Sequence, residues 1–259
     1  MEKLNIIYFS PTGTTKKVLL AIADGMGFEN FTEINITKKS NISKLEFSED
    51  DILIIGIPVY SGRIPLVALE RLQNIKGENT KAVLVAVYGN RHYDDVLLEM
   101  KNLVKDNGFI PIAAGAFIGQ HSFSSSKYPI ATGRPNNQDL KIAKEFGKNV
   151  VSKLSGKVEI LSLPGNFPYK ERSAKLDVKP KTDMALCNLC GACANACPVD
   201  AITIYKDRME IDEKKCIYCH ACVRVCPQSA RFIDDERVLA SAKRLSEVCA
   251  EPRKPELFL

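Results

Sequence analysis

Eight of the nine cysteines fall in two short runs whose spacing suits metal binding through sulfur. Each run has the pattern C-x₂-C-x₂-C-x₃-C-P, and every cysteine of the first run recurs 29 positions later, so the segment is an internal repeat. The thiolate form of cysteine is a strong metal ligand, and four thiolates at this spacing are typical of iron–sulfur binding. The two runs are Cys187, Cys190, Cys193 and Cys197, and Cys216, Cys219, Cys222 and Cys226.

This spacing resembles that of the two-cluster bacterial ferredoxins over roughly residues 180–235, which implies two [4Fe–4S] clusters. Three thiolates on a tight turn can reach three irons of one cube. The fourth thiolate lies further along the chain before a proline, and it reaches the other cube. The expected ligand sets are therefore crossed: Cys187, Cys190, Cys193 and Cys226 for one cluster, and Cys216, Cys219, Cys222 and Cys197 for the other.

Zinc and disulfides are the alternative uses of these cysteines. Structural zinc favours C-x₂-C pairs or mixed Cys/His sets, which two four-cysteine runs with trailing prolines fit poorly. A disulfide framework requires an oxidising compartment, and the N-terminus does not resemble a signal peptide. The ninth cysteine, Cys249, fits neither run and is expected to be a spare thiol.

The N-terminal residues predict a second binding site, for a phosphate group. An apolar strand over 3–9 leads into a loop rich in hydroxyls, and a helical pattern then runs to Met26. This order places backbone N–H groups and the positive end of a helix at the loop. The alternative is a helix start capped by Ser or Thr without any ligand. The candidate phosphate-binding residues are Ser10, Thr12, Gly13, Thr14 and Thr15.

Strands and helices then alternate along the chain. The apolar patterns predict further strands over 30–36, 51–57, 82–87 and 109–118, and helices over 65–72, 94–104 and 138–154. Five strands with crossover helices indicate an α/β fold with a doubly wound five-stranded parallel sheet. Such a sheet binds its ligand in the loops after the carboxyl ends of its strands.

With these loops, residues 1–155 resemble a flavodoxin, which implies bound FMN. The first loop matches the flavodoxin S/T-x-T-G-x-T pattern, and the loops at 58–65 and 88–95 would flank the flavin ring. Tyr60 and Tyr93 are the candidate stacking residues, Tyr88 is a weaker third, and Gly62 could allow a peptide flip. The alternative is that these residues only end strands and make turns. The candidate ring-binding residues are Pro58, Val59, Tyr60, Ser61, Gly62, Tyr88, Gly89, Asn90 and Tyr93.

Charged and titratable residues near these loops raise further expectations. A positive charge at Arg63 or Arg91 would favour reduced, anionic flavin. His92 and His121 are candidate proton donors, with plain solvated polarity as the alternative. The segment after Phe117 is longer than a strand end requires, so it is expected to cover the flavin or to meet the ferredoxin domain.

The whole chain divides into four expected parts. They are a flavodoxin-like domain (1–155), a linker (156–180) that is a solvated tether or a docking surface, a small α+β two-cluster ferredoxin domain (181–237), and a C-terminal helix and tail (238–259). The net charge of +5 falls to about +1 with two clusters at about −2 each, so it is no evidence for nucleic acid. No apolar run is long enough for a membrane span, which predicts a cytoplasmic protein.

The combination resembles the ferredoxin/flavodoxin fusion proteins of anaerobic bacteria and archaea. This resemblance implies an intracellular electron-transfer protein that links one-electron clusters to FMN and exchanges electrons with ferredoxin- or flavodoxin-dependent oxidoreductases. One alternative is a flavin-dependent reductase of a small organic or disulfide acceptor, although no catalytic residue is identified. Another is a redox-sensing binding module. The long linker also suggests a head-to-tail homodimer.

Overall fold

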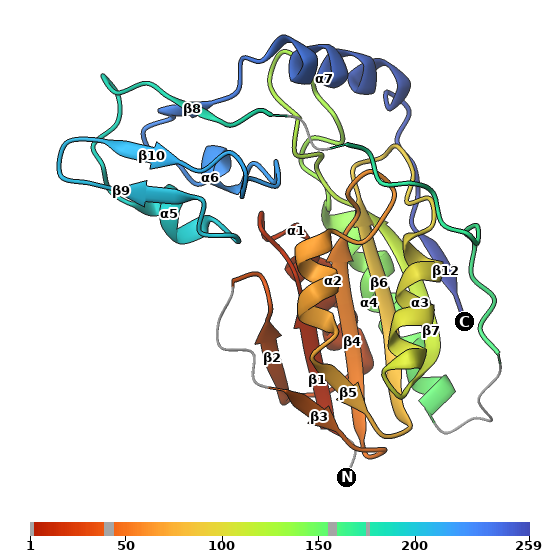
Figure 1. Cartoon of the computed structure of the whole chain (residues 1–259). Coiled ribbons are helices and arrows are strands. Elements are labelled where there is room, and N and C mark those ends of the chain that lie inside the picture. The colour runs from red at the N-terminus through yellow and green to blue at the C-terminus, as the bar shows by residue number, and fades with distance from the viewer. Residues whose placement is uncertain (1–2, 39–43, 155–159, 175–176) are drawn as a thin grey trace.

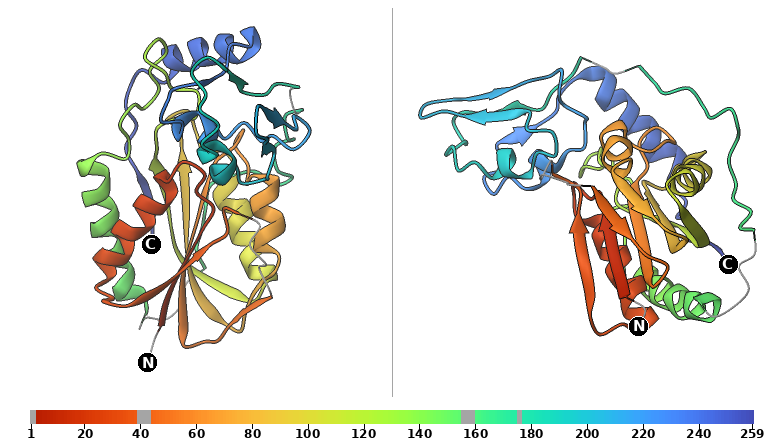
Figure 2. Two further views of the ribbon diagram at one scale, coloured as in Figure 1. Left: turned by 90° about the vertical axis from the view of Figure 1, so that its left-hand side faces the viewer. Right: turned by 60° about the horizontal axis from the view of Figure 1, so that its bottom comes forward.

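The computed structural model describes residues 3–38, 44–154, 160–174 and 177–259. A large α/β domain carries a small domain at one end of its sheet, above the carboxyl ends of the parallel strands (Figure 1). The views in Figure 2 show the same arrangement from two other sides. Among the described residues, no helix is both long and apolar enough to cross a membrane.

Five parallel strands form the centre of the α/β domain. Their order is β2–β1–β4–β6–β7, in which the first strand of the chain lies between the second and third long strands. This is the 2-1-3-4-5 order of a flavodoxin-like doubly wound sheet, so the predicted fold class is confirmed. The strands are β1 (Lys3–Tyr8), β2 (Phe31–Asn35), β4 (Asp51–Pro58), β6 (Thr80–Tyr88) and β7 (Phe109–Ile118).

Helices cover both faces of this sheet, which explains the continuous apolar runs of its central strands. On one face, α1 (Thr14–Met26) and α4 (Asn137–Leu154) enclose a core that includes Leu19 and Phe146. On the other face, α2 (Leu66–Leu72) and α3 (Val96–Asp106) enclose a second core. Two short strands, β3 (Leu45–Phe47) and β5 (Ile75–Gly77), pair beside this second layer.

A sixth strand corrects the expectation of five. The C-terminal strand β12 (Glu256–Phe258) pairs antiparallel with β7 at the edge of the sheet. Only its three residues extend the ladder, so it carries too short a pattern to be recognised in the sequence. The tail before it is held by Asn90, whose side-chain amide donates to the carbonyl oxygens of Cys249 and Glu251 at 2.8 and 2.9 Å.

The small domain repeats one structural unit twice. Its helices are α5 (Ala192–Ala196) and α6 (Ala221–Arg224). One hairpin joins β9 (Ile202–Ile204) to β10 (Met209–Ile211). The second sheet pairs β8 (Lys181–Thr182), before the first cysteine run, with β11 (Arg231–Phe232), after the second. The two halves are therefore interlocked.

Two further segments return to the α/β domain. Helix α7 (Glu236–Val248) packs Leu245, with Cys249 after it, against Ile130 and Phe123 of the loop after β7. Residues 160–172 of the expected linker run along α3, where Leu161 and Leu163 join the core. Residues 156–159 and 175–176 of that linker lie outside the described residues.

Candidate functional site

Each cysteine run wraps its chain around a cavity by using left-handed backbone conformations. The same three positions of the repeat have positive φ in both copies: Leu189 and Tyr218 (56° and 55°), Gly191 and His220 (76° and 59°), Asp200 and Ser229 (49° and 51°). The second pair occupies the N-caps of α5 and α6. Because L-residues rarely adopt this region, its recurrence shows that the two loops have one geometry.

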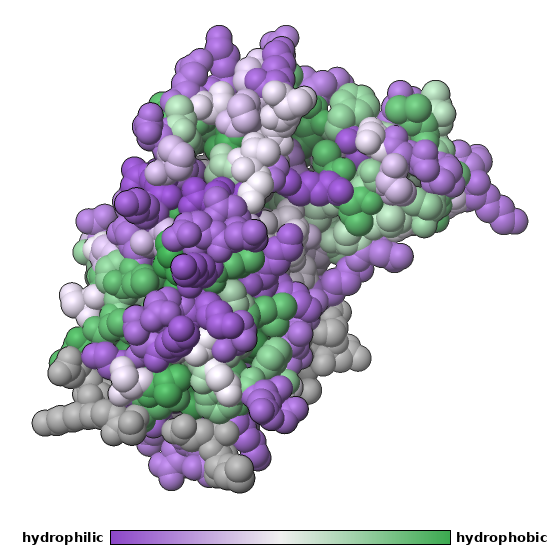
Figure 3. Space-filling view, turned by 180° about the vertical axis from the view of Figure 1, so that it is seen from behind, coloured by the Kyte–Doolittle hydropathy of each residue, from purple (hydrophilic) through white to green (hydrophobic). Residues whose placement is uncertain are grey.

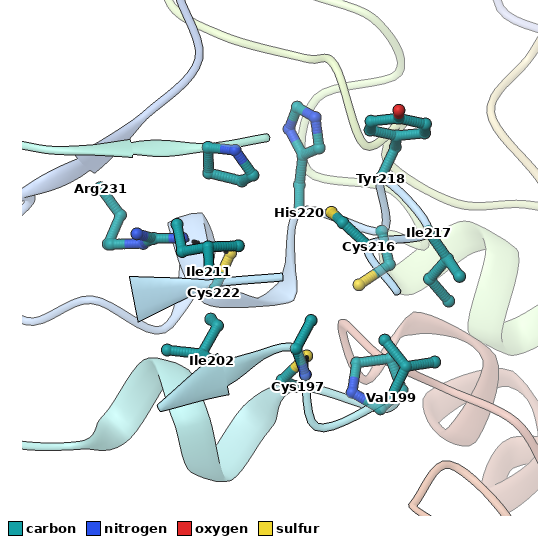
Figure 4. Close-up of a pocket in the computed structure, with 14 residues that line it drawn as sticks. Cys197, Val199, Ile202, Ile211, Cys216, Ile217, Tyr218, His220, Cys222 and Arg231 are labelled. Carbon is teal, nitrogen blue, oxygen red and sulfur yellow. Dashed lines mark hydrogen bonds between the residues drawn. The ribbon is translucent and has the colours of Figure 1, made fainter. Parts of the chain in front are cut away.

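Two cavities bring the thiols together in sets of four. The first, which we call the inner cavity, is lined by Cys197 together with Cys216, Cys219 and Cys222 (Figure 4). The second, the outer cavity, is lined by Cys226 together with Cys187, Cys190 and Cys193. In each set the fourth cysteine comes from the other half of the repeat. Four thiols around a cavity fit a cubane cluster, whose irons each bind one cysteine.

The surroundings of the thiols are apolar, so their charged form needs a cation. Burial raises the pKa of the Cys219 thiol to about 12. Burial also raises the pKa of Cys193, and the positive charge of Arg231 opposes that rise. Among the described residues, no three His, Cys, Asp or Glu side chains meet closely enough for a single metal ion. The thiols instead surround two volumes, where iron would stabilise the thiolates.

The loop after β1 has the features of a phosphate site. Gly13 is the N-cap of α1 with φ of 80°, so no cap side chain covers the first N–H groups of the helix. The hydroxyl of Thr15 is fully buried and, among the described residues, has no hydrogen-bond partner. Ser10 Oγ accepts from Lys16 N at 3.1 Å, and the hydroxyls of Thr12 and Thr14 lie 3.3 Å apart. An unpaired buried donor beside a helix N-terminus fits a phosphate oxygen.

The loop after β4 is a tight turn next to the inner cavity. Tyr60 and Arg63 exchange two backbone hydrogen bonds of 3.1 Å, while Ser61 and Gly62 both have positive φ. Before the turn, Pro58 ends β4, and Val59 N donates to the carbonyl of Val87 on β6. Tyr60 is half-buried. Burial, and then the nearby thiols of Cys219 and Cys216, raise the pKa of Tyr60 well above its ordinary value.

The loop after β6 is packed against the C-terminal tail. Tyr88 and Tyr93 are each 2% exposed, and Tyr93 Oη donates to Glu256 on β12 at 2.7 Å. Asn90 is buried by the tail contacts described above, whereas Gly89 lies against the ring of His121. Tyr93 is therefore buried by the tail in this structure. Tyr60, by contrast, is only half-buried and lies near the thiols of Cys219 and Cys216.

The arginines of these loops form ion pairs within the protein. Arg63 forms a two-point ion pair with Glu99 at 2.8 Å, and Glu99 also accepts from Arg172 at 2.8 Å. Arg91 forms an ion pair with Asp94. The positive charge of both loops is thereby largely balanced.

The two candidate histidine donors have different surroundings. Burial, and then the charges of Arg224 and Arg91, lower the pKa of His121 to about 4, so this imidazole is neutral near pH 7. His92 stacks on the ring of Tyr93, and its Nδ1 accepts from the backbone N–H of Asp94 at 2.8 Å. His121 therefore carries no extra proton near pH 7, and Nδ1 of His92 is occupied by a hydrogen bond within its own loop.

The segment from 163 to 172, which we call the strap, is held by acidic residues of the α/β domain. Asp95 accepts from the backbone N–H groups of Asn166 and Lys170 at 2.8 and 2.6 Å. The side chain of Lys170 lies 3.3 Å from Asp94. The basic residues of this segment are thus partly engaged inside the chain.

Several contacts join the small domain to the α/β domain near the inner cavity. The buried guanidinium of Arg71 on α2 donates to the carbonyl oxygen of Pro198, the residue after Cys197, at 2.7 Å. Arg224 on α6 donates to the carbonyl oxygen of His121 at 2.7 Å. The rings of Phe123 and His220 lie 5.1 Å apart, and Ile217 packs on the core of the α/β domain. The long segment after Phe117 therefore meets the small domain.

Sequence reasoning missed two residues at this site, Arg71 and Arg231. Arg71 belongs to a helix whose sequence pattern predicts one face on the core and one in solvent, and gives no reason to expect a contact with another domain. Arg231, buried between the two cavities, stands where the repeat predicts an apolar side chain, because the equivalent position of the first half is Ile202. That break in the repeat was the available signal.

Residues 186–230 match a family model described as a 4Fe-4S dicluster domain. No curated protein matches the chain. Among solved structures, an archaeal flavodoxin superposes with a TM-score of 0.40 at 12% identity, covering 60% of this chain and 99% of its own. Oxidised flavodoxin 1 of Bacillus cereus gives a TM-score of 0.42 at 19% identity, with 60% and 100% covered.

A third solved structure is the rubredoxin oxygen:oxidoreductase of Desulfovibrio gigas, which superposes with a TM-score of 0.43 at 17% identity. It covers 60% of this chain, but the match spans only 36% of that enzyme. The fold of residues 3–154 is assigned from their own strand order. The chain thus joins a flavodoxin-like α/β domain to a domain that matches the 4Fe-4S dicluster family, which is the arrangement of a flavodoxin/ferredoxin fusion.

Proposed function

We propose that this protein transfers electrons between two [4Fe–4S] clusters and an FMN bound at the loops after β1, β4 and β6. A cubane cluster passes one electron at a time, whereas FMN accepts one or two, so the protein would convert between one-electron and two-electron chemistry. The chain's own contribution is to hold the three groups in a fixed order and to keep water from the junction between the domains.

The observation that carries this proposal is the position of the inner cavity beside Tyr60. The thiols of Cys216 and Cys219 are close enough to affect the pKa of Tyr60, which lies in the loop expected to flank the flavin. Arg71 and Ile217 fix the same side of the small domain to the α/β domain. An electron on the inner cluster would therefore be next to the flavin site without any domain movement.

The outer cavity supports exchange with a partner protein. All residues that line it belong to the small domain, and Cys190 is exposed. Hydrophobic side chains reach the surface of the projecting small domain in Figure 3. Several large ones are close in sequence to the ligands of this cavity: Met184, Leu186, Val225 and Phe232. Exposed apolar surface beside a redox centre suits a transient protein contact.

The loop after β7 favours electron exchange over turnover of a small substrate. A reductase would be expected to use this loop to close a substrate pocket. Here its backbone accepts from Arg224, and its Phe123 packs beside His220 of the small domain. His121 of the same loop is neutral near pH 7 because burial lowers its pKa to about 4.

An anaerobic reductive titration tests the proposal. Iron, sulfide and flavin are quantified on one purified sample, and absorbance and EPR follow the reduction. We expect about eight irons and one FMN per chain, with clusters and flavin reaching redox equilibrium without an added mediator. Iron without flavin, or flavin that equilibrates only with a mediator, would overturn the proposal.

A further inference from the structure

Arg231 is a buried cation that interrupts the internal repeat. Its side chain replaces the isoleucine found at the equivalent position, Ile202, and it is 3% exposed. Nη2 lies 3.4 Å from Cys222 Sγ, and Nη1 donates to Thr182 Oγ1 at 2.6 Å. Nε is buried and, among the described residues, has no hydrogen-bond partner.

The guanidinium lies between the two sets of thiols. Arg231 lines both the inner and the outer cavity, and Figure 4 shows it beside Cys222 on the inner one. In the part of the chain that the structure describes, Asp and Glu side chains form no ion pair with it. A buried charge is costly unless an opposite charge lies near. Two clusters that each carry about −2 with their ligands would supply that opposite charge on both sides.

We propose that Arg231 is a shared redox-tuning residue that raises the reduction potentials of both clusters, and most strongly that of the cluster held by Cys222. When a cluster gains one electron, its charge with its ligands changes from about −2 to −3. A fixed positive charge stabilises the reduced form more than the oxidised form, and the N–H···S contact adds to this effect at Cys222. No bond is formed or broken, and no proton moves.

This inference rests on the cluster assignment within the proposed function, but its test does not involve the flavin. Arg231→Gln and Arg208→Gln each remove one positive charge from the small domain. Arg208 is the matched control because it is more than half exposed and pairs with Glu210 on the surface. Iron and sulfide are quantified first, and an EPR-monitored redox titration then gives the potential of each cluster.

We expect Arg231→Gln to lower both potentials, with at least a tenfold change in the reduced-to-oxidised ratio of the inner cluster at a fixed solution potential. For a one-electron couple this equals about 59 mV. Arg208→Gln should change the potentials much less, because water screens its charge.

Arg231→Lys separates tuning from packing, because lysine keeps the charge and loses the planar fork. We expect the potentials of Arg231→Lys to lie between those of Arg231→Gln and those of the unmodified protein. Unchanged potentials in Arg231→Gln, or equal shifts in Arg208→Gln, would overturn the proposal. Loss of clusters in both Arg231 variants would also overturn it, since Arg231 would then act in cluster assembly. Whether FMN is present affects none of these outcomes.

Discussion

The buried guanidinium of Arg71 donates a hydrogen bond to the carbonyl oxygen of Pro198, 2.7 Å away, and so ties α2 to the residue after Cys197, the expected cluster ligand. The same guanidinium donates to the carbonyl oxygens of Ile36 and Thr37 at 2.8 and 2.5 Å, just after β2. One side chain thus fixes the end of a strand, a helix and the small domain to one another.

Arg71→Met should loosen this junction. The substitution leaves three buried carbonyl oxygens without their donor, which we expect to lower the free energy of unfolding by about 2–3 kcal/mol. Electron exchange between the clusters and the flavin should slow, because the inner cavity is no longer fixed beside Tyr60. Denaturant unfolding measures the first effect, and stopped-flow reduction under anaerobic conditions measures the second.

Lys38→Met provides the control for Arg71. Lys38 also crosses the junction, but its Nζ lies 3.7 Å from Asp200 and both side chains are largely exposed. Surface ion pairs contribute about 0–1 kcal/mol, so this variant should unfold and exchange electrons much like the unmodified protein. Equal behaviour of the two variants would show that Arg71 does not fix the domains.

Cys197→Ser and Cys226→Ser should each remove the cluster of the other half of the repeat. Cys197 lines the cavity of Cys216, Cys219 and Cys222, so its loss should empty the inner site and leave about four irons per chain. Cys226→Ser should retain the inner cluster. Iron analysis with EPR counts the remaining clusters.

The rate of flavin reduction distinguishes the two cysteine variants. Reduction of the flavin through the remaining cluster should stay fast in Cys226→Ser, where the inner cluster adjoins Tyr60, and should slow in Cys197→Ser. If each variant lost the cluster of its own cysteine run, the rates would be reversed and the crossed ligand sets would be wrong.

The sequence predicted those parts of the fold that carry long or repeated patterns. The strand over 109–118 agrees with β7, because ten mostly buried residues leave a clear apolar run. The cysteine spacing predicted which four cysteines gather at each cavity, because the spacing of a ligand motif reflects local chain geometry. The strand β12 has only three residues, so the sequence did not predict it. The hydrogen bond from Tyr93 to Glu256 on this strand, which helps to bury Tyr93, was therefore not predicted either.

The missed residues act through tertiary contacts that leave little trace in local sequence. Glu99 lies on α3, yet it balances Arg63 from the loop after β4 and Arg172 from the strap. No pattern over a few residues indicates such a pairing, because its members are 36 and 73 positions apart. The sequence therefore carried no sign that Glu99 would balance the charge of Arg63.

Thr15→Val should separate the stability of the α/β domain from its affinity for FMN. Valine keeps the shape of threonine and removes a buried hydroxyl that has no partner among the described residues. The flavin-free protein should be as stable as before, or slightly more stable. Affinity for FMN should fall by about 5–30-fold, the loss of one hydrogen bond of 1–2 kcal/mol to a phosphate oxygen. Fluorescence titration with FMN measures this.

Thr80→Val is the matched control for Thr15. The hydroxyl of Thr80 is also buried, but it donates to the backbone carbonyl oxygens of Phe47 and Ser48 at 2.9 and 2.8 Å. Its removal should destabilise the domain by about 1–2 kcal/mol and leave FMN affinity unchanged. Unchanged FMN affinity in Thr15→Val would exclude Thr15 from the phosphate site.

Lowering the pH should weaken the domain junction through His121. Burial, then Arg224 and Arg91, lower the pKa of His121 to about 4, whereas an exposed imidazole has a pKa near 6.5. Between these pH values, His121 binds a proton when the domain junction is open and its imidazole is exposed, but not when the junction is closed. The closed junction therefore loses stability as the pH falls from about 6.5 towards 4. At pH 5 the expected loss is about 2 kcal/mol.

Hydrogen exchange of residues 119–124 at pH 7 and pH 5, corrected for intrinsic exchange rates, measures this opening. Protection should fall at pH 5 in the unmodified protein and fall less in His121→Gln. His220, whose ring lies 5.1 Å from that of Phe123, is unchanged in both proteins. His92→Gln is the control, because the side chain of His92 is 42% exposed and pairs with Asp94 of its own loop. Equal pH dependence in His121→Gln and His92→Gln would contradict the assignment, because protonation of His121 could then not be what opens the junction.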